Sequence, residues 1–370
     1  MGRIRHLLVV GIAALFSQPC AALAESDEWQ TVAPTAVGLD QSRLETLSGK
    51  IRQGEFGNIH SLLIARNGKL AVEEYFKGPD ERRGESTGNV TFTAADLHDL
   101  RSVTKSVVSA LFGIALASDP GRSVDDPILS YFPQYKDLQT PDRLGIRLRD
   151  LLSMAAGWDW NEELSYTDPH NSETRMDAAA DRYRFILEQP MVAKPGQVFN
   201  YNGGCTALLA AVIARWTSTS IDQYAEQVLF RPLHISQYEW IKDASGTPYA
   251  ASGLRLRPRD MLKFGQLYLD KGRWNGAQIV PESWVKESLT PHVTVSGDMK
   301  YGYQWWLLTD SKATNQQIVW GAAYGNGGQR IWLIPSANLL VVVTAGRYNE
   351  PYVGRILRTL LNDYILTAIH

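Results

Sequence analysis

The sequence has no excess of either charge and very little cysteine, and each shortage excludes a class of protein. Its 370 residues include 37 Lys and Arg against 39 Asp and Glu, a net charge of -2, so no surface for nucleic acid is expected. No apolar stretch reaches the roughly 18 residues of a transmembrane helix, so no membrane span is expected either. What is present, 44% hydrophobic and 21% charged residues, is typical of an ordinary globular protein.

The first residues have the pattern of a secretory signal peptide. Arg3 and Arg5 form a charged start, an apolar run covers 7–16, and Ala22-Leu23-Ala24 is a small-x-small cleavage site. We therefore expect residues 1–24 to be removed and the mature chain, 25–370, to be periplasmic or secreted. Cys20 is lost with the signal, so Cys205 has no partner for an intramolecular disulfide and is expected to be a buried apolar group.

Common motifs for metals, nucleotides and α/β-hydrolase chemistry are missing as well. The chain has no G-x-S-x-G, no H-E-x-x-H, no Walker A motif and no dinucleotide fingerprint, and its seven histidines are scattered. We therefore expect neither a metal site nor an organic cofactor. A glycine-rich run at 325–328 precedes a predicted strand rather than a helix, so it is not a phosphate loop.

Strand patterns lie at both ends of the chain, with helical patterns between them. Each end has a predicted hairpin, the first around Asn67-Gly68 and the second around 335–338. The region from about 122 to 250 is mainly helical, and a helical period over 353–369 closes the chain. The polar segment Gly78 to Asn89 is expected to be a loop. This order predicts an α/β (α+β) domain whose antiparallel sheet is built from both chain ends, flanked by helices, with an inserted mainly helical region.

A serine and a lysine stand three residues apart at the start of a predicted apolar helix, in Ser102-Val103-Thr104-Lys105. Residues at i and i+3 share a helix face, and the helix N-terminus offers N–H groups and positive potential to an oxyanion. The lysine could take the serine proton, or stay charged and lower the pKa of a neighbouring base. The alternative is that Ser102 has a structural role only, as the N-cap of the helix. A second S-x-x-K, from Ser283 to Lys286, is predicted to lie on a short surface helix and serves as an internal control.

Five segments of the chain carry recognisable motifs in a fixed order, at 100–106, 150–157, 194–204, 301–306 and 325–329. Together they resemble the serine β-lactamase and D-alanyl-D-alanine peptidase superfamily, most closely its class C β-lactamase-like branch of esterases and 6-aminohexanoate-dimer hydrolases. The resemblance implies that fold, with Ser102 as the acylated nucleophile and Lys105 and Tyr201 as its base system.

The sequence departs from the family pattern in two motifs. The second motif is usually Y-x-N but here reads Tyr201-Asn202-Gly203, so Asn202 could replace the missing amide only by pointing differently. The third motif, usually K-T-G or H-x-G, is absent, and the run 325–328 resembles its G-x-G-G variant. That variant implies the Asn326 N–H as an oxyanion donor beside the Ser102 N–H, with Gly327 as a substrate contact. The missing lysine weakens a β-lactam interpretation, although Arg347 could supply a charge.

Aromatic residues fall where the amide hydrolases of this group have a loop over the substrate. By that resemblance Tyr166 is a candidate leaving-group contact and Trp158 a further substrate contact. The sequence thus predicts an exported serine hydrolase that acts on a small-molecule ester, amide or peptide-like substrate. Two alternatives stay open: a β-lactamase or D-alanyl-D-alanine peptidase, and an inactive relative that binds peptidoglycan or a partner.

Overall fold

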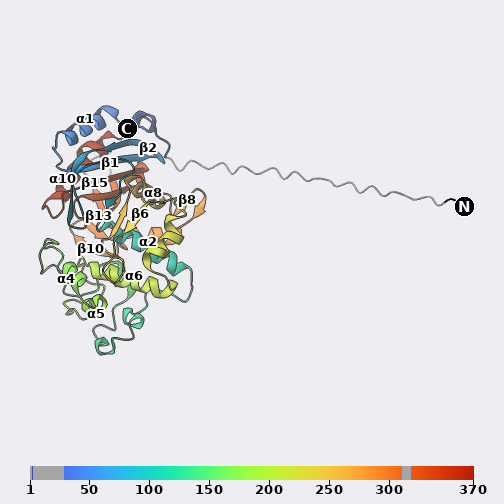
Figure 1. Cartoon of the computed structure of the whole chain (residues 1–370), viewed down its shortest axis with the longest axis vertical. Coiled ribbons are helices and arrows are strands. Elements are labelled where there is room, and N and C mark those ends of the chain that lie inside the picture. The colour runs from blue at the N-terminus through green and yellow to red at the C-terminus, as the bar shows by residue number, and fades with distance from the viewer. Residues whose placement is uncertain (1, 3–28, 311–317) are drawn as a thin grey trace.

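The computed structural model describes residues 2, 29–310 and 318–370 (Figure 1). Apart from Gly2, the predicted signal peptide at 1–24 lies outside the described residues. Among the helices that the structure describes, none combines the length and the apolar character needed to cross a bilayer.

The centre of the molecule is an eight-stranded antiparallel sheet in the order β10-β11-β12-β13-β14-β15-β1-β2. The strand β1 pairs with β15, so the two chain ends meet within one sheet, as the strand patterns predicted. The hairpin between β1 and β2 turns at Asn67 and Gly68, whose positive φ angles (54° and 71°) are those an Asn-Gly turn requires. The strands are β1 (Ile59–Arg66), β2 (Lys69–Tyr75), β10 (Val293–Ser296), β11 (Met299–Tyr301), β12 (Trp306–Asp310), β13 (Ile318–Gly325), β14 (Gln329–Ile334) and β15 (Leu339–Ala345).

Helices cover both faces of this sheet, so its central strands are apolar on both sides. Leu62 and Ile64 of β1 enter one core with α1 (Gln41–Arg52), while Leu63 and Ala65, which alternate with them, enter the other. The first core also takes the closing segment, which is helical as predicted but irregular. The second takes α8 (Pro258–Leu269). Figure 1 shows α1 and the C-terminus together on the outer side of the sheet. The closing segment consists of α10 (Val353–Thr359), η6 (Leu360–Ile365) and η7 (Leu366–Ala368).

The loop predicted for Gly78 to Asn89 is wrong. The segment forms the hairpin β3 (Lys77–Arg82) and β4 (Glu85–Thr91), which turns at Arg83 and Gly84 with φ angles of 48° and 93°. This hairpin is a separate two-stranded ribbon, and most of β4 is exposed. A strand that is polar on both faces lacks the alternation by which strands are read from sequence.

The inserted region is mainly helical, and it holds the serine motif against the sheet. The helix α2 (Val103–Ala117) is buried along almost its whole length and packs against α6 (Gly203–Thr217). A small sheet of β5 (His98–Asp99), β6 (Tyr238–Trp240) and β7 (Leu254–Leu256) precedes and flanks α2. The remaining helical elements are η1 (Pro34–Val37), η2 (Ile128–Tyr131), η3 (Lys136–Leu138), α3 (Leu148–Leu152), α4 (Ser172–Ala178), α5 (Arg182–Leu187), α7 (Ile221–Ala225), η4 (Glu226–Phe230), α9 (Glu282–Ser288) and η5 (Pro335–Ala337), and the last strands are β8 (Arg273–Trp274) and β9 (Ala277–Gln278).

Candidate active site

Ser102 stands immediately before the first residue of α2, at the end of a strained turn. The preceding residue, Arg101, has a φ of 49°, a left-handed conformation that costs a non-glycine residue about 1–3 kcal/mol. Three contacts hold it there: an ion pair with Glu81 (2.6 Å), a second with Asp99 (3.2 Å) and the ring of Tyr348, 4.7 Å from the guanidinium carbon. The turn fixes Ser102 at the N-cap position of α2, where the helix dipole stabilises negative charge.

Lys105 lies one helical turn further on and its ammonium group faces the serine. The Nζ atom donates to Ser102 Oγ at 3.0 Å and to the Ala251 carbonyl at 3.1 Å, and it lies 3.5 Å from Glu173 Oε2. Burial alone would lower the pKa of Lys105, but the Glu173 carboxylate and the neighbouring Tyr201 and Glu162 outweigh burial and raise it. Lys105 is therefore a cation at neutral pH.

Tyr201 joins these two residues from the start of α6. Its ring centroid lies 4.9 Å from Lys105 Nζ, and the packing of α6 against α2 is what brings it there across 99 residues of sequence. Burial raises the pKa of Tyr201, while the Lys105 charge and a hydrogen bond with Ser102 act in the opposite direction. The three residues proposed from sequence as nucleophile and base system are thus neighbours in the structure.

Two glutamates, the buried Glu173 and the half-buried Glu162, lie behind this trio, and sequence reasoning missed both. Glu173, on α4, accepts a hydrogen bond from Ser252 (2.8 Å) in addition to its contact with Lys105. Glu162 accepts from the indole of Trp160 (2.6 Å) and from the hydroxyl of Tyr166 (3.2 Å). Both glutamates fall in a polar, aromatic-rich loop region that has no motif spacing, so no pattern pointed to them.

The two glutamates take opposite protonation states. Burial and the negative charge of Glu173 raise the pKa of Glu162 to about 8. Burial also opposes ionisation of Glu173, but Lys105, Ser252 and Arg83 outweigh it and lower the pKa of Glu173. At neutral pH the pair therefore holds one negative charge, which balances the Lys105 ammonium.

The glycine that replaces the usual motif asparagine makes room for this acidic pair. A Cβ atom on Gly203 would clash with Glu173 Oε2 and would lie 3.0 Å from Glu162 Oε1. The Gly203 N–H also donates to Glu162 Oε1. A side chain at position 203 and the Glu173 carboxylate thus compete for one space beside Lys105.

The end of β13 lies against the segment that carries the serine. A Cβ atom on Gly325 would clash with the carbonyl oxygen of Leu100, so only glycine permits this approach. Asn326 follows and lines the same cavity as Ser102. Its side chain is held by Asn349 through two hydrogen bonds, 3.0 Å from Asn326 Nδ2 to Asn349 Oδ1 and 2.9 Å from the Asn349 N–H to Asn326 Oδ1.

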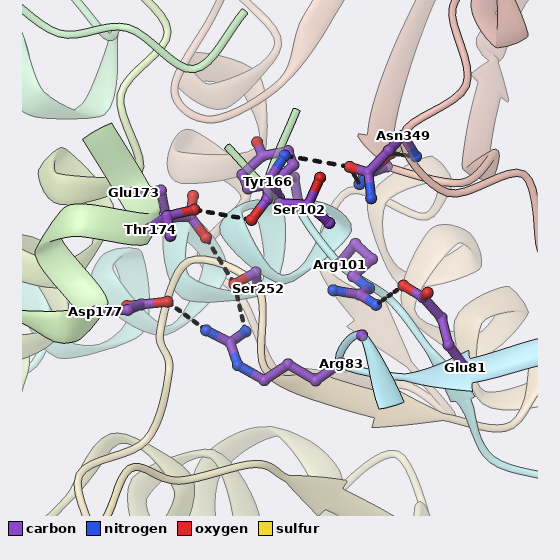
Figure 2. A pocket seen from close by; sticks show the side chains of 13 residues that line it. Glu81, Arg83, Arg101, Ser102, Tyr166, Glu173, Thr174, Asp177, Ser252 and Asn349 are labelled. Atoms are coloured by element: carbon purple, nitrogen blue, oxygen red, sulfur yellow. Dashed lines mark hydrogen bonds and ion pairs between the residues drawn. The ribbon is translucent and has the colours of Figure 1, made fainter. Parts of the chain in front are cut away.

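A cavity of about 180 Å³ opens above Ser102, which is 9% exposed to it (Figure 2). Figure 2 shows that both arginines in its wall are ion-paired, Arg83 with Asp177 and Arg101 with Glu81. Tyr166 is also in the wall, and its backbone N–H donates to Asn349 Oδ1 at 3.3 Å. The cavity wall therefore contains two cationic side chains, and the charge of each is balanced by an acidic partner.

The other residues predicted to contact substrate lie outside this wall. Trp158 is 1% exposed, and its backbone forms an antiparallel β-bridge with Met191. Asn202 is also buried, and its side-chain oxygen accepts from the Cys205 N–H (3.1 Å) as the N-cap of α6, so its amide is used by the helix. Gly327 is buried beneath the ring of Tyr348.

Arg347 is not among the residues that line the cavity. Its guanidinium pairs with Glu350 at 2.6 Å and donates to the Phe56 carbonyl at 3.3 Å. It does not replace the lysine of the missing third motif.

Cys205 and the second S-x-x-K motif, neither of which was assigned a role in catalysis, lie where the sequence predicts. Cys205 is fully buried in α6, and burial raises the pKa of its thiol well above the ordinary value. Ser283 and Lys286 of the second S-x-x-K are both exposed on the short helix α9.

Comparison with known proteins agrees with this architecture. The 6-aminohexanoate-dimer hydrolase of Paenarthrobacter ureafaciens is 26% identical over 350 residues, which cover 88% of this chain and 81% of that protein. Two solved structures share the fold: EstCE1, a hydrolase with promiscuous acyltransferase activity, and the octameric penicillin-binding protein homologue from Pyrococcus abyssi. EstCE1 has a TM-score of 0.67 at 17% identity and covers 87% of this chain and 98% of its own. The Pyrococcus abyssi protein has a TM-score of 0.63 at 18% identity, covering 89% and 78%.

The family model described as Beta-lactamase matches residues 60–362, most of the chain and all of the elements that build the site. The expected resemblance and fold are confirmed. The chain belongs to the β-lactamase family and is a serine hydrolase of that fold.

Proposed function

We propose that this protein cleaves an ester or amide through an acyl-enzyme on Ser102, with Lys105 and Tyr201 as its base system. The observation that supports this most directly is the Lys105 Nζ to Ser102 Oγ hydrogen bond of 3.0 Å, at the head of α2 and in the wall of a cavity. A serine that only caps a helix would bond the backbone N–H groups of its own helix, and no such side-chain cap is formed by Ser102.

The charge of Lys105 assigns the proton transfers to Tyr201. A lysine held as an ammonium cannot take the serine proton, whereas Tyr201 can when it is ionised. Because burial raises the pKa of Tyr201, the tyrosinate is the minor form at neutral pH and the Lys105 charge is what favours it. Ser102 Oγ attacks the carbonyl carbon as its proton passes to Tyr201. Tyr201 then gives that proton to the departing alcohol or amine, which leaves the acyl group on Ser102. Water then attacks the acyl carbon and loses a proton to Tyr201. The bond to Ser102 Oγ breaks, Tyr201 returns the proton to that oxygen, and the acid is released.

Two backbone N–H groups are proposed to stabilise the oxyanion. The Ser102 N–H stands at the N-terminus of α2, and the Asn326 N–H stands where β13 meets Leu100. Losing one such donor costs about 2.7–4 kcal/mol of transition-state stabilisation in enzymes where it has been measured.

The charges of the cavity favour a substrate that does not depend on a carboxylate. Arg83 and Arg101 are both ion-paired with acidic residues, and Arg347 lies outside the cavity wall and is paired with Glu350. A β-lactam or a D-alanyl peptide carries a carboxylate that would need a free cation. We therefore propose ester or amide hydrolysis ahead of β-lactam hydrolysis, with Tyr166 beside the leaving group.

The N-terminal pattern supports a further proposal, export from the cytoplasm. Removal of residues 1–24 would leave a mature chain that begins at Glu25. Expression of the full chain in a bacterium, followed by fractionation and N-terminal sequencing, tests this. A cytoplasmic protein that still begins with Met1 would contradict it.

The central test combines a mechanism probe with a substrate panel. A fluorophosphonate should label Ser102 in the folded protein and fail to label Ser102→Ala. The panel consists of p-nitrophenyl esters, linear amides and nitrocefin. Labelling with ester or amide turnover supports the proposal, rapid nitrocefin turnover favours a β-lactamase, and no labelling of Ser102 in folded protein contradicts it.

A further inference from the structure

A second cluster of chemically active side chains is buried away from the serine. His60 of β1, Asp80 of β3 and His98 of β5 come from three different sheets and meet at β5, the strand that leads into the turn carrying Ser102. His60 Nδ1 lies 2.8 Å from His98 Nε2, and Asp80 Oδ1 lies 3.8 Å and 3.7 Å from those two nitrogens. All three side chains are at most 8% exposed.

The hydrogen bonds of the outer ring nitrogens fix where each imidazole proton lies. His60 Nε2 faces two acceptors, Asn58 Oδ1 at 3.0 Å and the Pro79 carbonyl at 3.1 Å. The Asn58 amide cannot be turned around, because its Nδ2 already donates to the Pro79 carbonyl at 2.7 Å and the Gly346 carbonyl at 3.2 Å. His60 therefore carries its proton on Nε2.

The same reasoning applies to the second ring. His98 Nδ1 faces the Asp99 carbonyl at 3.0 Å, which can only accept, so the His98 proton lies on Nδ1. The two inner nitrogens, His60 Nδ1 and His98 Nε2, are thus both left with lone pairs that point at one another. With the Asp80 oxygen beside them, three electron-rich atoms converge with no proton between them.

Three converging lone pairs in a buried place repel one another, and a bound cation would remove that repulsion. Two neutral imidazoles and a carboxylate form a donor set that suits zinc, and imidazole ligands are oriented in such sites by an outer N–H bonded to a carbonyl. Both histidines have that outer bond, and Asp80 accepts a hydrogen bond from the Tyr348 hydroxyl at 2.9 Å. We propose that His60, Asp80 and His98 bind a divalent transition-metal ion, with zinc as the best fit.

The surroundings of the cluster keep these donors in place. A Cβ atom on Gly346 would come within 2.6 Å of His60 Cε1, and one on Gly78 would clash with Asn58 Oδ1. The ring of Phe92 stacks on His60 with centroids 4.2 Å apart. Two glycines and an aromatic cover hold the first imidazole against its carbonyl partners, as a preformed site requires.

The ion would act on structure rather than in the reaction. It would join the β3–β4 hairpin and β5 to the large sheet, and β5 leads directly into Arg101 and Ser102. Tyr348 touches both Asp80 and Arg101, so the cluster and the strained turn share a support. The ion does not contact Ser102, and this inference is independent of the proposed reaction.

The test uses the whole protein, stripped with EDTA and then given one equivalent of Zn²⁺ or Co²⁺. We expect about one bound ion per chain by elemental analysis, visible Co²⁺ absorption bands typical of imidazole ligands, and a higher melting temperature with metal than without. Failure of the stripped wild-type protein to take up an ion would overturn the proposal. A proton shared between the imidazoles, seen by ¹⁵N NMR as one imidazolium without metal uptake, would overturn it as well.

Variants assign the ion to these residues. His60→Gln and His98→Gln should each abolish stoichiometric uptake, whereas His170→Gln should not, because His170 is an exposed surface histidine beside Asp168. Uptake that survives both core substitutions but is lost in His170→Gln would overturn the assignment. Should the core variants fail to fold, uptake by wild type and by His170→Gln still decides the matter. Ser102→Ala should bind the ion normally, which separates this result from the fate of the serine mechanism.

Discussion

Glu173 Oε2 occupies the space that a side chain on Gly203 would need, 3.5 Å from the Lys105 ammonium. The family motif usually places an asparagine at this position, and here a carboxylate from α4 stands beside the lysine in its place. The Glu173 charge keeps Lys105 protonated, so it determines which residue can act as the base. The missing amide is thus replaced by an ion pair that comes from elsewhere in the chain.

Restoring the asparagine should therefore be harmful while Glu173 is present. Gly203→Asn is expected to displace the Glu173 carboxylate and to lower kcat/KM at least about 10-fold, and Glu173→Ala in the same chain should recover part of that loss by vacating the space. Coupled neighbours typically show interaction energies of about 0.5–3 kcal/mol. Steady-state kinetics of the two single variants and the double variant measure this. Additive losses would show that the two positions do not compete.

The control for that cycle is Gly49→Asn. A Cβ atom on Gly49 of α1 meets nothing within 4 Å, so this variant should keep wild-type kinetics. A comparable loss there would mean that the Gly203 effect is not local.

The two S-x-x-K motifs give a second prediction. Ser102→Ala should lower ester turnover by at least about 1,000-fold, because it removes the hydroxyl that forms the proposed acyl-enzyme. Ser283→Ala, on the exposed helix α9, should leave turnover within about twofold of wild type, since it removes no contact of the site. Initial rates with a p-nitrophenyl ester decide between them, and equal losses would overturn the choice of motif.

The pKa of Glu162, raised to about 8 by burial and by Glu173, gives a prediction for stability. A carboxyl whose folded-state pKa lies above its unfolded value contributes stability that is fully present below about pH 4.3 and is lost as the pH rises through 8. Glu162→Gln does not ionise, so its melting temperature should exceed that of wild type by a margin that grows between pH 5 and pH 9. Thermal melts at both pH values measure the margin. Glu163→Gln, an exposed neighbour, should show no such trend.

The same ionisation should shape the pH dependence of catalysis. A charged Glu162 raises the pKa of Tyr201 and so disfavours the tyrosinate that takes the serine proton. We expect kcat/KM of wild type to level off or fall above about pH 8, and Glu162→Gln to continue rising with pH. Identical profiles for the two proteins would remove Glu162 from the electrostatics of Tyr201.

The sequence contained enough to predict the sheet and the trio, but not their surroundings. Asn67-Gly68 predicts its hairpin because a two-residue turn needs positive φ at both positions, which Asn and Gly adopt more readily than other residues. Tyr201 could be connected to Ser102 only through a family resemblance, because 99 residues separate them. Glu173 and His98 have no local pattern, since their partners come from other elements and the interaction exists only after folding. The β3–β4 ribbon was missed for the opposite reason, as its local signal is polar throughout.

The approach of β13 to the serine turn gives the last prediction. An alanine at Gly325 would place its Cβ against the Leu100 carbonyl, and a backbone atom cannot rotate out of the way as a side chain can. The end of β13 and the segment carrying Ser102 must then separate, which moves the Asn326 N–H away from the oxyanion. Gly325→Ala is therefore expected to lower kcat by about 100- to 1,000-fold, as the loss of one oxyanion donor does. Gly321→Ala in the same strand meets only the ends of leucine side chains, the nearest at 3.0 Å, and should retain most activity. Circular dichroism and thermal melts confirm that both variants are folded. A folded Gly325→Ala protein with wild-type kcat would show that the second oxyanion donor lies elsewhere.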